Sequence, residues 1–211
     1  MSDLEPRLRG VFHLVGFVAS VAAGIVLGVL ADRGRENLAS WLYVGSLAAM
    51  FGCSALYHRY PWKTGAGRAW ARRVDHSTIF LFIAGSYTPF LLLSFEGKFP
   101  VVLLIVVWSG AGLGIILNLA WIDAPRWLTA GVYLALGWGG IALVPRLFTD
   151  VGVAPGVLVV IGGGLYTVGA LAYAARRPNP IPAWVGFHEV FHVLVLAAAV
   201  VQFVAVSLVV L

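Results

Sequence analysis

Long apolar runs fill most of the chain, separated by short breaks that are polar or contain glycine and proline. About 20 consecutive apolar residues let an α-helix cross the hydrocarbon core of a bilayer. By that measure the pattern predicts seven spanning helices. Their expected bounds are Val11–Ala31, Leu38–Tyr60, Ala71–Ser94, Phe99–Trp121, Trp127–Phe148, Val153–Ala174 and Ala183–Leu211. The short connections predict an all-α, seven-transmembrane-helix bundle that forms a single domain over residues 1–211.

The composition supports a membrane protein. Of the 211 residues, 61% are hydrophobic and 11% are charged, whereas a soluble domain carries about 25% charged residues. The net charge is +5, but the basic residues sit in short loops. They form no basic helix face of the kind that binds nucleic acid. The pattern therefore predicts a multi-pass protein of the cell inner (plasma) membrane whose partners are membrane lipids. It carries no signal for the oligomeric state.

The distribution of lysine and arginine predicts the orientation of the bundle. With seven spans, the N-terminal tail and the second, fourth and sixth connections lie on one side of the membrane. They carry ten basic residues: Arg7, Arg9, Arg59, Lys63, Arg68, Arg72, Arg73, Arg126, Arg176 and Arg177. The other side carries four, namely Arg33, Arg35, Lys98 and Arg146. Because basic residues favour the cytoplasmic side, we expect the N-terminus in the cytoplasm and the C-terminus outside.

Two histidines stand at the start of the last apolar run, in the stretch Phe187-His188-Glu189-Val190-Phe191-His192. Side chains four residues apart lie on one face of a helix, with Cβ atoms about 5–6 Å apart. Both imidazoles can therefore reach one metal ion. Glu189 points away from that face. Because ionisable groups inside apolar helices are costly and mark functional sites, the histidine pair predicts a metal centre.

His58 and Asp75 are the candidates to complete this centre. His58 ends the second predicted helix, and Asp75 lies about one turn into the third. Under the orientation above, both reach the side on which the last helix begins. Three helices thus bring four metal-type side chains to one depth, which random placement would not do. Two further histidines, His13 and His76, lie on the same side. His13 is a candidate to support the centre from outside the metal ligands, whereas His76 points about 100° away from Asp75 round the helix and is not expected to bind the metal.

Each candidate also has a purely structural interpretation. The histidines could contact lipid head groups at the interface. Asp75 could pair with Arg72 or Arg73 at the start of its helix, where the helix dipole favours an acid. Ser54 lies four residues before His58 and so on its face, and serines often serve as small packing residues in membrane helices.

Four segments together resemble the hemolysin III family, the bacterial branch of the progestin and adipoQ receptors, which includes the adiponectin receptors. They are SALYH at 54–58, DHSTIF at 75–80, AGSYTPF at 84–90 and HEVFH at 188–192. The resemblance covers essentially the whole chain and implies seven transmembrane helices with a cytoplasmic N-terminus. The family's opening motif, a Glu, an Asn and a Thr-His pair, is clearly matched here only at His13.

The resemblance implies that His58, His188 and His192 bind Zn²⁺, and that Asp75 and Ser54 hold or polarise a zinc-bound water. Three protein ligands leave the fourth position of zinc open, as in catalytic sites. Zinc can lower the pKa of its water to about 7 and polarise a carbonyl, and Asp75 could accept the proton.

By resemblance, the substrate is a ceramide-like or other amide lipid, hydrolysed near the cytoplasmic face by a zinc-dependent amide hydrolase. Two alternatives stay open. One is a non-catalytic, receptor-like regulator of membrane lipid homeostasis with a structural zinc. The other is the pore-forming cytolysin that the family's name suggests, which the lack of an amphipathic, secretable segment disfavours.

Overall fold

The computed structural model describes residues 6–31 and 34–211. Within those ranges, seven helical spans are long and apolar enough to cross a membrane, so the predicted all-helical membrane fold is confirmed. Arg33, one of the residues in the orientation count, lies outside the described residues. The elements are α1 (Val11–Leu30), α2 (Arg35–Arg59), α3 (Gly65–Leu93), α4 (Lys98–Ala120), α5 (Arg126–Trp138), η1 (Ile141–Leu143), α6 (Val144–Arg146), η2 (Leu147–Val151), α7 (Val153–Ala175) and α8 (Phe187–Val210).

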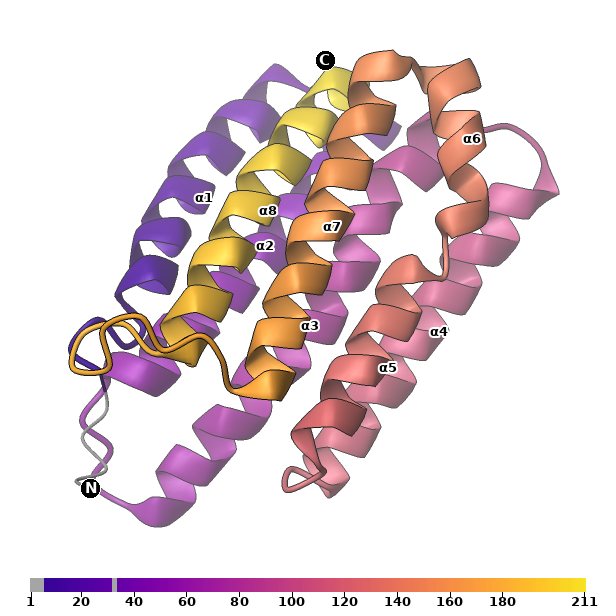
Figure 1. Ribbon diagram of the computed structural model, residues 1–211. Coiled ribbons are helices and arrows are strands. Elements are labelled where there is room, and N and C mark those ends of the chain that lie inside the picture. The colour runs from indigo at the N-terminus through magenta and orange to yellow at the C-terminus, as the bar shows by residue number, and fades with distance from the viewer. Residues whose placement is uncertain (1–5, 32–33) are drawn as a thin grey trace.

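The last helix lies against the first three, although it is far from them in sequence. The most extensive contacts join α7 to α8, α2 to α3, α1 to α2 and α3 to α4, and α8 also contacts α1, α2 and α3. Figure 1 shows α8 among these helices, with the start of α1 and the end of α8 at opposite ends of the bundle. The main core is made by buried side chains of α2, α3 and α8, among them Tyr43, Phe51, Phe82, Val195 and Val206. This packing brings the start of α8 to the end of α2.

The outer faces of the bundle are apolar. Large hydrophobic side chains are exposed along the length of several helices, including Val29 of α1, Ile116 of α4 and Leu208 of α8. A soluble monomer rarely leaves such extended apolar surface in contact with water. The exposed faces therefore fit a lipid environment.

The fifth span is not the continuous helix predicted for Trp127–Phe148. α5 ends at Trp138, and short 3-10, α and π turns complete the crossing. The hydroxyl group of Tyr87 in α3 donates to the carbonyl of Gly137 and accepts the N–H of Gly140, at 2.9 Å. A Cβ at Gly140 would lie 2.3 Å from the Tyr87 ring, so the approach requires glycine. The break is stable inside a membrane because a neighbouring side chain bonds the backbone groups that it frees.

Two helix starts also differ from the prediction. α3 begins six residues before the predicted Ala71, because the side chain of Thr64 accepts a hydrogen bond from the Gly67 N–H at 3.1 Å and caps the helix there. α8 begins four residues after the predicted Ala183, because the Val185 N–H closes a turn onto the Ile181 carbonyl at 2.7 Å, and the Glu189 side chain then caps the helix at Gly186. The later start places the two histidines of α8 in its first two turns.

Candidate metal centre

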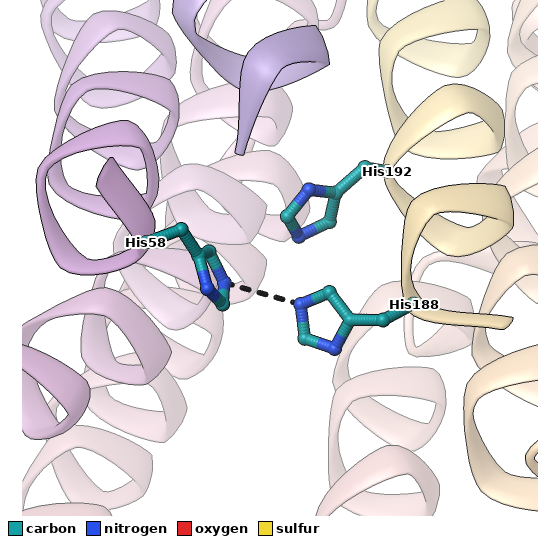
Figure 2. Close-up of side chains that lie close together, drawn as sticks. All are labelled: His58, His188 and His192. Carbon is teal, nitrogen blue, oxygen red and sulfur yellow. Dashed lines mark hydrogen bonds between the residues drawn. The ribbon is translucent and has the colours of Figure 1, made fainter. Parts of the chain in front are cut away.

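His58, His188 and His192 come together from two helices. His58 lies in the last turn of α2, which ends at Arg59. The helix ends there because Tyr60 precedes Pro61, and a residue before proline is biased away from helical geometry. His188 and His192 lie in the first two turns of α8. Figure 2 shows the ring of His58 facing the two rings of α8.

The nitrogen atoms of the three rings approach one another as metal ligands do. Nε2 of His188 lies 3.1 Å from Nε2 of His58 (Figure 2), and one nitrogen of each ring lies within 4.8 Å of the others. Two nitrogens bound to one tetrahedral zinc at about 2.0–2.1 Å are about 3.3 Å apart. The donor type of these residues and the spacing of His58 and His188 therefore fit zinc, and His192 offers a third nitrogen within 4.8 Å of both. The predicted meeting of the three histidines is confirmed, and the zinc itself stays a prediction.

Asp75 lies beside the histidines. Its Oδ2 atom is 4.0 Å from Nε2 of His58, and the residue is only 6% exposed. The neighbouring arginines are engaged elsewhere: Arg72 pairs with Asp123 at 3.1 Å, and Arg73 donates to backbone carbonyl groups. In the described part of the chain, Asp75 therefore does not form the alternative ion pair with either arginine.

Ser54 connects Asp75 to His13. The Ser54 hydroxyl is buried, lies 2.8 Å from Nδ1 of His13, and also hydrogen-bonds the Asp75 side chain. A serine hydroxyl has one proton to donate. When that proton goes to the Asp75 carboxylate, the oxygen accepts the Nδ1–H of His13, which fixes the tautomer of that imidazole. The chain of two hydrogen bonds holds the carboxylate on the histidine side of α3.

His13 also contacts the predicted metal ligands directly. Its ring stacks on the ring of His192, with the centroids 3.6 Å apart and the planes inclined by 14°. His13 is 3% exposed, and neither its Nε2 nor the Nδ1 of His192 has a hydrogen-bond partner in the described structure. His13 thus orients both Ser54 and His192. The sequence signals of this role are a histidine at the same membrane depth and its match to the opening motif of the family.

Glu189 and Arg9 form an ion pair next to the centre, which sequence reasoning missed. Oε1 of Glu189 lies 2.7 Å from Nε of Arg9, and its Oε2 accepts the N–H of Gly186 at 2.8 Å. The Glu189 side chain is fully buried, whereas that of Arg9 is 19% exposed. Glu189 therefore caps the start of α8 and ties the N-terminal segment to it. From the sequence, Glu189 could be placed on the face away from the histidines, but its partner Arg9 could not be predicted.

A cavity of about 220 Å³ begins at Asp75, His188 and His192 and continues into the bundle. His76 lines this cavity but does not belong to the cluster of three histidines. Beyond the polar groups the walls are mainly apolar. They include Ile79, Phe82, Phe90, Leu143 and Val195.

Seven apolar spans, a cluster of three histidines with a buried carboxylate at one end, and a largely apolar cavity define an integral membrane protein with a metal-type site inside its helical bundle. The family described as "Haemolysin-III related" matches residues 1–203, and the chain belongs to this family. The family predicted from the four sequence segments is thereby confirmed.

Bacterial and animal proteins are among the relatives. The chain is 31% identical over 205 residues to the "Hemolysin-3 homolog" of Bacillus subtilis (strain 168), covering 96% of this chain and 92% of that protein. It is 29% identical over 209 residues to "Hemolysin-3" of Bacillus cereus, covering 96% and 90%. It is 27% identical over 216 residues to the "Adiponectin receptor protein" of Drosophila melanogaster, covering 92% of this chain and 48% of that protein.

Proposed function

We propose that this protein is a zinc-dependent lipid amide hydrolase of the cell inner (plasma) membrane, acting near the cytoplasmic face. The observation that carries the proposal is the group of three imidazole nitrogens within 4.8 Å of one another beside the buried Asp75. Three protein ligands leave zinc with an open position, which is typical of catalytic rather than structural sites.

His58, His188 and His192 would hold the zinc. Bound there, zinc would polarise a substrate carbonyl and make an attacking water more acidic. Asp75, whose Oδ2 lies 4.0 Å from the Nε2 of His58, is placed to take a proton from that water and return it to the leaving amine. Ser54 keeps the carboxylate oriented toward the histidines.

The cavity supports an amphiphilic substrate. Asp75, His188 and His192 lie at one end, and apolar side chains such as Ile79 and Phe82 line much of the part beyond. An acyl chain in this cavity would place its amide carbonyl at the polar end, in keeping with the usual division of labour in ligand pockets. A ceramide-like or other amide lipid has both the acyl chain and the amide carbonyl, and its hydrolysis would release a fatty acid and an amine.

The test measures zinc content and lipid turnover on the same purified preparation. We expect about one zinc per wild-type chain, as in other three-ligand sites, and its loss in the double variant His188→Ala/His192→Ala. His76→Ala is the matched control and should keep the metal, because His76 is outside the cluster. Asp75→Asn should keep the zinc and lose about 100- to 10,000-fold in turnover, because an amide cannot take the proton.

Each contrary result has a defined meaning. Full zinc content in the double histidine variant would refute the metal centre, and zinc lost with Asp75→Asn would make the aspartate a metal ligand. Bound zinc without turnover of any amide lipid would favour the regulator with a structural zinc. Because one relative is named as a hemolysin, solute leakage from vesicles containing the protein checks the pore alternative.

A further inference from the structure

Two polar side chains lie deep in the cavity without hydrogen-bond partners. Gln202 of α8 is 8% exposed, and its side-chain amide makes no hydrogen bond within the described residues. The hydroxyl of Tyr166 in α7 is buried and likewise has no partner there. Both residues line the cavity that begins at the histidines. Inside a membrane protein, polar groups left without partners are costly, so these two require an explanation.

The two side chains lie within about one helical turn of each other on neighbouring helices. A Cβ built on Gly162 would lie 3.4 Å from the side-chain oxygen of Gln202, so Gln202 lies against α7 at that turn. Tyr166 is one helical turn from Gly162 and on the same face. Long helical side chains point toward the N-terminus of their own helix. Because α7 and α8 run in opposite directions (Figure 1), both side chains are directed toward the same level of the cavity, and we infer that Tyr166 and Gln202 form one polar patch.

This patch lies well away from the candidate metal centre. Gln202 is ten residues beyond His192 on α8, which corresponds to about 15 Å along the helix axis. Tyr166 is seven residues, or about 10 Å, from Tyr173, whose ring centroid is 5.6 Å from that of His188. A ligand that reaches both ends of the cavity must therefore span about 10–15 Å.

We propose that Tyr166 and Gln202 form a subsite for a hydroxyl or carbonyl group carried part-way along the hydrocarbon chain of the bound amphiphile. An extended chain covers about 1.2 Å per bond, so the group would stand about eight to twelve bonds from the head group. The inference rests on the proposed function for placing the head group at the histidines. It does not require turnover.

A substituted hydrocarbon chain fits this cavity better than water alone. A buried water needs about 10–15 Å³ of accessible space, and the cavity offers about 220 Å³. Ile79, Phe82 and Val195 line the path between the histidines and the patch, and such walls offer a file of waters no hydrogen bonds. One polar group on an otherwise apolar chain would lie at the polar patch, and the rest of the chain would lie along the apolar side chains.

The test is equilibrium binding of stearate and of hydroxystearates whose hydroxyl is moved along the chain. It uses the full-length purified protein and displacement of a fluorescent fatty acid. The isomers with the hydroxyl about eight to twelve bonds from the carboxylate should bind about two- to tenfold more tightly than stearate, the effect of one net hydrogen bond. Tyr166→Phe, which removes one oxygen atom, should abolish that preference and leave stearate affinity unchanged. Gln202→Leu should reduce it.

Tyr133→Phe is the matched control. Tyr133 also lines the cavity, but its hydroxyl already donates to the His76 carbonyl at 3.0 Å, so this variant should keep the positional preference. Equal affinity for stearate and every isomer, binding of none of them, or a preference that survives in both Tyr166→Phe and Gln202→Leu would overturn the subsite. A positional preference without hydrolysis of any amide lipid would support the subsite and contradict the hydrolase.

Discussion

Removing Arg9 should destabilise the protein more than removing the charge of its partner, Glu189. The Glu189 side chain is fully buried and that of Arg9 is 19% exposed. Arg9→Met therefore leaves a carboxylate without a counter-charge in a place that water does not reach. Glu189→Gln leaves an arginine that can turn toward water or lipid phosphate. The two single variants are thus expected to be unequal although they break the same ion pair.

The structure sets the size of each effect. Removing one partner of a buried ion pair costs about 3–5 kcal/mol when the other stays buried, which is about 100- to 5,000-fold in the unfolding equilibrium. Glu189→Gln keeps an oxygen that can accept the Gly186 N–H, now bonded at 2.8 Å, so we expect a loss of only about 1 kcal/mol. The double variant Arg9→Met/Glu189→Gln removes the stranded charge and should be more stable than Arg9→Met alone.

The assay is equilibrium unfolding in mixed micelles with increasing sodium dodecyl sulfate, followed by tryptophan fluorescence, with zinc content measured on the same samples. Arg7→Met is the control. The Arg7 guanidinium stacks over the Trp184 ring at 4.7 Å from its centroid, an exposed contact worth about 0.5–1 kcal/mol. A loss for Glu189→Gln equal to or above that for Arg9→Met, or a double variant no more stable than Arg9→Met, would refute the reasoning.

Two further predictions concern the membrane and the packing of the bundle. Ten basic residues against four predict that a tag at residue 1 is protected in intact cells and a tag after Leu211 is accessible from outside; the reverse labelling pattern would contradict the orientation. A Cβ at Gly24 would lie 2.1 Å from a methyl group of Val44, whereas one at Gly45 meets nothing within 4 Å. Gly24→Ala should therefore cost about 1–3 kcal/mol by forcing α1 from α2, and Gly45→Ala should stay within about 0.5 kcal/mol of wild type in the same unfolding assay; equal losses would show that the contact is not limiting.

The spans could be predicted because bilayer thickness imposes one length on every crossing helix. The break in the fifth span could not, because it depends on a contact between distant parts of the chain. Tyr87 of α3 bonds the backbone at Gly137 and Gly140, and glycine-containing apolar runs of this kind are otherwise compatible with continuous membrane helices. The early start of α3 at Thr64 was missed for a different reason: the first turns of that helix are polar and carry no apolar signal.

The depth of the candidate site could be predicted, but its neighbours could not. His58 lies in the last turn of α2 and Asp75 in the first half of α3, and alternation of the spans is enough to place these two positions on one side of the bundle. Nothing in that argument says that α8 lies between α1 and α3, which is what brings His13 onto His192. Lateral order in a bundle follows from packing between helices, and a single sequence does not reveal it.

The Arg9–Glu189 pair shows why that lateral order matters for the metal centre. His188 and His192 share one helix, so any shift at the start of α8 moves both rings together relative to His58. Glu189 lies between them in sequence and points the other way, where Arg9 and the Gly186 N–H hold it. The spacing of 3.1 Å between His58 and His188 thus depends on a contact on the opposite face of the helix. If the two contacts are coupled in this way, Arg9→Met should lose zinc together with stability, and Arg7→Met should keep its zinc.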